Sequence, residues 1–90
     1  MKRTTDAICE EFADRGVQIT VKPLPEDSAY ILIEGDQTAF EFLGKLFLAH
    51  ATAEDCGFQI SPHCAGNALF SRAAQLGIYL HRLPCTERQP

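Results

Sequence analysis

The feature that most constrains the fold is a change in hydrophobic periodicity at Gly35 and Asp36. Before it, residues 30–33 read Tyr-Ile-Leu-Ile, which makes a strand apolar on both faces. After it, apolar residues recur every three to four positions, the period of a helix with one buried face. Asp36 is suited to cap that helix, because its carboxylate can accept a backbone hydrogen bond at the positive helix end. The pattern predicts a central strand over residues 29–34, covered on both sides, and then a helix to about residue 52.

The predicted helix has an apolar stripe and a polar outer side. A capping box formed by Thr38 and Glu41 is an alternative start two residues later. Leu48 falls on the outer side, four residues after Gly44, and a single exposed leucine is ordinary for a surface helix. The predicted buried stripe consists of Ala39, Phe42, Leu43, Leu46, Phe47 and His50. We expect His50 to be a core histidine whose hydrogen bonds are satisfied.

Upstream of this run the sequence indicates one more helix and one more strand. Residues 5–15 carry apolar side chains at helical spacing, and Gly16 supplies a stop. Residues 17–22 alternate between apolar and polar, which is typical of a half-buried strand. Pro23 should end that strand, since proline has no amide hydrogen to donate to a sheet. With a turn over residues 23–28, the two strands form an antiparallel hairpin.

Downstream of the long helix the sequence predicts three short strands, at residues 56–60, 68–70 and 77–81, with Pro84 ending the last. The element order is therefore α-β-β-α-β-β-β. This order indicates an α+β fold in which an antiparallel sheet of about four to five strands is packed by one long helix, with an additional N-terminal helix.

The chain is short and acidic, and both properties limit its function. Ninety residues form a single domain over 1–90, with a frayed tail at about 86–90. The net charge is −4, with eleven acidic and five basic residues in 1–55 and one acidic and three basic residues in 56–90. A nucleic-acid binder needs a basic surface, so no nucleic-acid partner is expected. An acidic face would instead attract a basic protein.

The sequence offers no targeting or membrane signal. Residues 4–14 are polar and charged where a secretory signal needs an apolar core. No window reaches the roughly 18 apolar residues of a membrane span. We therefore expect a cytoplasmic protein without a membrane partner.

Four cysteines and three histidines raise the question of a metal site. The closest group by sequence is Cys56, His63 and Cys64, with His81 and Cys85 further along, and whether these five residues approach one another stays open at this point. No C-x-x-C pair is present, and reduced thiols are expected in a cytoplasmic protein, so the sequence predicts no metal and no other cofactor. Adjacent residues such as His63 and Cys64 rarely act on one atom, and no known catalytic motif occurs. The sequence thus predicts no catalytic residues and no enzyme.

From Tyr30 onward, several segments follow the order of a known family. Residues 33–36 read Ile-Glu-Gly-Asp and open the helix, residues 58–60 form a short strand, residues 67–71 read Asn-Ala-Leu-Phe-Ser, and residues 76–84 read Leu-Gly-Ile-Tyr-Leu-His-Arg-Leu-Pro. Over about 55 of the 90 residues this order is similar to the thirty-second family of predicted immunity proteins in bacterial polymorphic toxin systems. The resemblance implies a stoichiometric protein binder, with a toxin as its partner, and carries no site residues with it.

Three hypotheses follow. The first is a small cytoplasmic protein-binding domain, for which the resemblance implies an immunity-type, stoichiometric inhibitor of a bacterial toxin. The second is a structural homodimer formed by self-association through edge strands or the outer helix face. The third is a small zinc-binding protein. The partner-binding face is not predicted by any motif in the sequence.

Overall fold

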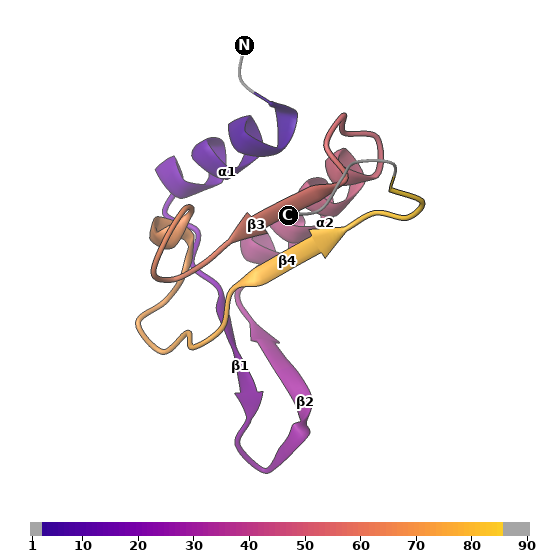
Figure 1. Ribbon diagram of the computed structural model, residues 1–90. Coiled ribbons are helices and arrows are strands. Elements are labelled where there is room, and N and C mark those ends of the chain that lie inside the picture. The colour runs from indigo at the N-terminus through magenta and orange to yellow at the C-terminus, as the bar shows by residue number, and fades with distance from the viewer. Residues whose placement is uncertain (1–2, 86–90) are drawn as a thin grey trace.

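The computed structural model describes residues 3–85 and has an α+β fold (Figure 1). The predicted tail at 86–90 lies outside the described residues. A short 3-10 helix, η1, stands where the sequence predicted a strand at residues 68–70. The elements in chain order are α1 (Thr4–Asp14), β1 (Thr20–Leu24), β2 (Asp27–Glu34), α2 (Gln37–Ala51), β3 (Gly57–Ile60), η1 (Asn67–Leu69) and β4 (Ile78–His81). Within 3–85, neither α1 nor α2 is long and apolar enough to cross a membrane.

β1 and β2 form the predicted antiparallel hairpin, with Val21 opposite Ile33 and Pro23 opposite Ile31. The prediction that Pro23 ends β1 is wrong. The carbonyl of Val21 bonds to a segment on the far side of β1, so odd-numbered residues of β1 point their backbone groups away from β2. Pro23 shares that orientation, and its missing amide hydrogen therefore costs the hairpin no bond.

The outer edge of β1 is occupied by the segment between η1 and β4. Ile19 forms a parallel bridge with Phe70, and the carbonyl of Val21 accepts from the amides of Gln75 and Leu76, each at 2.9 Å. β1 therefore has a backbone neighbour on both sides. β2 has β1 on one side and no other strand among residues 3–85.

α2 starts at the predicted cap. The carboxylate of Asp36 accepts from the amide of Ala39 at 2.9 Å, and it satisfies one of the free N–H groups of the first turn. Five of the six residues predicted for the buried stripe are buried. Phe47 is the exception and is exposed, because α1 packs along only one side of α2 and leaves the side that carries Phe47 and Leu48 uncovered.

One core joins the two helices to the second strand pair. The rings of Phe12 on α1 and Phe42 on α2 lie 5.5 Å apart, centroid to centroid. In Figure 1, α2 runs behind β3 and β4, and the buried side chains of Phe58 and Ile60 belong to the same cluster. The buried apolar residues of this core are Cys9, Phe12, Val17, Ile19, Val21, Ala39, Phe42, Leu43, Leu46, Phe58, Ile60, Leu69, Phe70 and Ala74.

The predicted sheet of four to five strands does not form among the described residues. β1 pairs with β2, and β3 pairs with β4, as two separate antiparallel pairs. The segment between β3 and β4 explains the separation: it passes along the outer edge of β1 as a loop and η1, so it contributes one bridge at Phe70 and no strand.

Candidate functional site

The β1–β2 hairpin projects from the body of the protein, and its second strand is open to solvent (Figure 1). The exposed fractions are 62% for Tyr30, 56% for Ile31 and 40% for Ile33. The prediction of a central strand covered on both faces is therefore wrong for this chain. The run is apolar on both faces, as a covered strand would be, yet only one of its residues, Leu32, is partly buried within residues 3–85.

The backbone of this strand is also open along one edge. In an antiparallel pair, residues that exchange hydrogen bonds alternate with residues that do not. The carbonyl of Val21 points away from β2, so Val21 and the residue opposite it, Ile33, form a non-bonded pair. The backbone N–H and C=O groups of Ile33 therefore point away from β1. Ile31, opposite Pro23, has the same orientation. The N–H and C=O groups of Ile31 and Ile33 thus line an edge that can receive another strand. We call this feature the β2 edge, meaning residues 30–33 and their outward backbone groups.

Acidic residues flank the β2 edge at both ends. Glu26 and Asp27 lie at the tip of the hairpin, and Glu34 lies at its base. Asp27 accepts a hydrogen bond from the amide of Ala29 at 3.0 Å, which shapes the turn. These three carboxylates form no ion pair with another residue of 3–85, so their charge is free to act on a partner.

A second exposed apolar surface lies on the outer side of α2. It comprises Phe40, Phe47 and Leu48, and Leu48 is 76% exposed, as the sequence indicated. Gly44 lies in this face with open space around its Cα. Unlike the β2 edge, this surface has no unpaired backbone groups, since they are used inside the helix.

Three of the five cysteines and histidines singled out in the sequence come together where β3 begins and β4 ends. These are Cys56, His81 and Cys85, and the two sulfur atoms and one imidazole nitrogen lie within 4.8 Å of one another. Cys56 and Cys85 are joined by a disulfide, which contradicts the expectation of reduced thiols. Within 3–85, His63 and Cys64 belong to no such cluster.

The pairing of β3 with β4 brings these residues together. Gly57 lies opposite His81, and the amide of Arg82 donates to the carbonyl of Cys56 at 2.8 Å. The chain then turns back, and Cys85 meets the buried side chain of Cys56. The sequence does not fix this contact, because positions 56 and 82 become neighbours only if the strands at 56–60 and 77–81 pair as a hairpin in this register.

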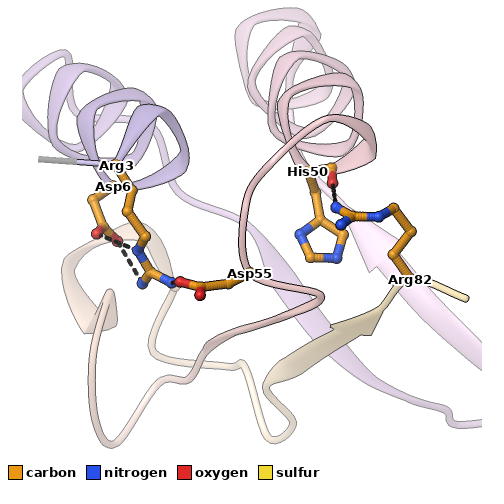
Figure 2. Close-up of polar contacts among 5 residues, drawn as sticks. All are labelled: Arg3, Asp6, His50, Asp55 and Arg82. Atoms are coloured by element: carbon orange, nitrogen blue, oxygen red, sulfur yellow. Dashed lines mark hydrogen bonds and ion pairs between the residues drawn. The ribbon is translucent and has the colours of Figure 1, made fainter. Parts of the chain in front are cut away.

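Arg82 also fastens this corner to the end of α2. Its Nη1 donates to the carbonyl of His50 at 2.7 Å (Figure 2). That carbonyl belongs to the last turn of the helix, where cationic donors are favourable because the C-terminal carbonyls lack partners within the helix. Arg82 therefore links α2, β3 and β4.

The ring of His50 is buried, with 7% of the residue exposed, as predicted. The expectation that its hydrogen bonds are satisfied is wrong, because neither ring nitrogen has a partner in the described part of the chain. An unpartnered buried imidazole nitrogen costs free energy. The side chain of His50 therefore packs in the interior, and its main-chain carbonyl accepts the hydrogen bond from Arg82.

A second polar group ties the start of α1 to the loop before β3. Arg3 donates to Asp6 at 2.9 Å and to Asp55 at 2.8 Å (Figure 2). Its guanidinium also lies 5.6 Å from the ring centroid of Phe58. The hydrogen bond with Asp6 is the main reason that the pKa of Arg3 is raised, and the bond with Asp55 adds to it. All three charged side chains are exposed, so this network positions the chain and contributes little stability.

The two free cysteines differ in reactivity. Burial raises the pKa of the Cys9 thiol to about 11, and the nearby charge of Asp6 acts in the same direction. A thiol with so high a pKa carries almost no thiolate at neutral pH, so Cys9 is a poor nucleophile and behaves as a small apolar residue. Cys64 is exposed.

Sequence reasoning thus predicted a strand at residues 29–34 but expected it to be covered, and it left open which of the five cysteines and histidines come together. Comparison with known protein families, with curated proteins and with solved structures finds no match for this chain.

Proposed function

We propose that the chain is a stoichiometric protein-binding domain that uses the β2 edge as its contact surface. The observation that carries this proposal is the exposure of Tyr30, Ile31 and Ile33 in a run that is apolar on both faces. An apolar edge strand with unpaired backbone groups can take up a further strand, and many proteins recognise extended partner segments in this way. In this role the chain works by contact and is not a catalyst.

The charges around the β2 edge define the chemistry of the partner. Glu26 and Asp27 at one end and Glu34 at the other enclose an apolar centre. A complementary strand has an apolar centre flanked by lysine or arginine, because opposite charges across paired strands stabilise the pair. The net charge of −4 adds long-range attraction toward a basic protein.

A second copy of this chain fits the β2 edge less well than a basic partner. If two copies pair antiparallel with Ile31 of one copy opposite Ile31 of the other, the end of each strand that carries Glu34 lies beside the end of the other strand that carries Asp27. Like charges brought together across a strand pair destabilise it. Light scattering separates the two cases, since a homodimer would have twice the monomer mass of 10.0 kDa.

The immunity resemblance names a toxin as the partner, and one copy of the chain would neutralise one copy of the toxin. Co-expression with the product of the neighbouring open reading frame tests this directly. We expect the neighbour to be toxic alone, harmless when co-expressed, and recovered with the chain in a one-to-one complex. A harmless neighbour, or the absence of a complex, would remove the basis of the immunity proposal.

Two matched variants test the contact surface itself. Ile31→Lys places a charge on the β2 edge, and Leu48→Lys places the same charge on the outer side of α2. Full burial of an isoleucine is worth about 1.5–3 kcal/mol. Since 56% of Ile31 remains exposed for a partner to cover, its loss should weaken binding by roughly tenfold, and repulsion from a basic partner adds to this. Equal affinities for the two variants would refute the assignment of the β2 edge.

A further inference from the structure

The cluster of Cys56, His81 and Cys85 lies apart from the β2 edge and has no part in the proposed strand addition. Thiolate sulfur and imidazole nitrogen are the ligands that zinc prefers in proteins, and two cysteines with one histidine form a known three-ligand set that leaves a fourth position for water. We propose that in the reduced protein these three residues bind one Zn²⁺ ion, at the place where the oxidised protein carries the Cys56–Cys85 disulfide.

The distances suit a tetrahedral ion. Zinc–sulfur and zinc–nitrogen bonds of about 2.3 and 2.0 Å place neighbouring ligand atoms roughly 3.5–3.8 Å apart. The two sulfur atoms and the imidazole nitrogen of the cluster already lie within 4.8 Å of one another. The Cα atoms of Cys56 and Cys85 are 5.9 Å apart, so once the disulfide is reduced, rotation of the two side chains can bring the sulfur atoms to the required spacing without moving the backbone.

Backbone pairing that does not depend on the disulfide holds Cys56 and His81 in place, and Cys85 follows three residues after Arg82. The β3–β4 pairing fixes His81 opposite Gly57, and the amide of Arg82 bonds to the carbonyl of Cys56. Cys56 is buried, Cys85 is partly buried and His81 is exposed. Such an arrangement gives the ion two sulfur ligands from the protein side and leaves its fourth position facing solvent.

The two states use the same sulfur atoms and therefore exclude each other. A dithiol reductant transfers two electrons and two protons to the disulfide, which yields two thiols while the reductant becomes a cyclic disulfide. Zn²⁺ then replaces the two thiol protons and takes the neutral imidazole of His81 and one water as its remaining ligands. In a reducing compartment, where disulfides are rare, zinc would hold the end of β4 against the start of β3 in place of the disulfide.

Cobalt(II) is a suitable probe, because cobalt–thiolate charge transfer and the visible bands of tetrahedral cobalt report ligand type and geometry. The full untagged chain is reduced with a phosphine, freed of metal, and titrated with Co²⁺ without oxygen. We expect one Co²⁺ per chain with thiolate charge-transfer absorption, complete displacement by Zn²⁺, and no such absorption in the oxidised protein. Reduced chain that shows no charge transfer with equimolar Co²⁺ would overturn the proposal.

Variants assign the ligands. Cys85→Ser should lower the charge-transfer absorption per bound Co²⁺, because Cys56 is then the one sulfur ligand left. His81→Gln should weaken Co²⁺ binding by more than about tenfold, the smallest loss expected when even a supporting group of a metal site is removed. The matched controls are Cys64→Ser and His63→Gln, which alter the exposed neighbouring pair and should leave binding unchanged. Because His81→Gln retains all four cysteines, it reports on the site even if Cys85→Ser fails to fold. Unchanged binding in His81→Gln, or lost binding in either control, would contradict the assignment.

Discussion

Reduction of the Cys56–Cys85 disulfide in metal-free protein should remove a large part of the stability of this chain. The bond joins residues 29 positions apart. Closing a loop of that length lowers the entropy of the unfolded chain by about 12 cal/mol/K, which corresponds to about 3.6 kcal/mol at 25 °C. The whole free energy of unfolding of a domain of this size is about 5–14 kcal/mol. The disulfide therefore contributes between about a quarter and about seven tenths of the free energy of unfolding.

Thermal unfolding followed by circular dichroism measures this loss. In a domain of 60–100 residues, each kcal/mol shifts the Tm by about 4–8 °C. Wild-type protein with a phosphine reductant and a chelator should therefore unfold roughly 15–30 °C below the oxidised protein. Cys85→Ser should have the low Tm under both conditions. Cys64→Ser, which keeps the disulfide and removes an exposed thiol, should respond to reductant as the wild type does.

Two results would refute this reasoning. A fall in Tm of less than about 4 °C on reduction corresponds to less than 1 kcal/mol, and it would mean that the bond does not constrain the unfolded chain. A reductant response that disappears in Cys64→Ser would mean that a different pair of cysteines carries the effect. Adding Zn²⁺ to the reduced wild type should restore part of the lost Tm, because a ligand that binds only the folded state stabilises it.

Three further predictions concern the fold. Asp36→Ala removes the cap of α2 and should lower the free energy of unfolding by about 1 kcal/mol in urea, whereas Asp36→Asn, which keeps the accepting oxygen, should change it little. Phe42→Ala should cost about 3–5 kcal/mol because the ring is fully buried, while Phe47→Ala on the exposed side of α2 should stay within about 0.5 kcal/mol; equal costs would contradict the orientation of the helix. The thiol of Cys9 has an ordinary pKa of 9.0 when unfolded and about 11 when folded, so the unfolded chain loses this proton first and the free energy of unfolding should fall as pH rises from about 9 to 11. Cys9→Ala should lack this component of the pH dependence, and an identical pH profile in the two proteins would show that Cys9 is not buried as the structure has it.

Local features of the fold followed from the sequence because the responsible residues are neighbours in the chain. Asp36 caps α2, Gly16 stops α1 with a φ of +79°, and the hairpin pairs as expected. Each depends on chemistry within a few residues. Pro23 was misjudged because its effect depends on which edge of the strand it faces, and that edge is set by a segment some fifty residues later.

The candidate site was harder to predict, because it depends on contacts between segments that are distant in the sequence. Two-sided apolarity in residues 30–33 indicates that both faces favour burial, but it does not say whether the cover belongs to the same chain. The cysteine–histidine cluster depends on the register of β3 against β4, which places Cys56 beside Arg82 across the pair. Spacing along the chain carries no information on that register, so metal-ligand spacing rules missed the cluster.

The occupied outer edge of β1 has a consequence for stoichiometry. Many proteins with open strand edges polymerise, because each added copy presents a fresh edge to the next. In this hairpin the backbone of Ile19 and Val21 is already engaged by residues 69–76, so the two-stranded sheet can grow in one direction only. A partner strand that docks on β2 takes the one open edge that residues 3–85 leave on this hairpin. Each copy can therefore accept one strand through this sheet, as a one-to-one complex requires, and copies of the chain cannot link through it into an open-ended fibre.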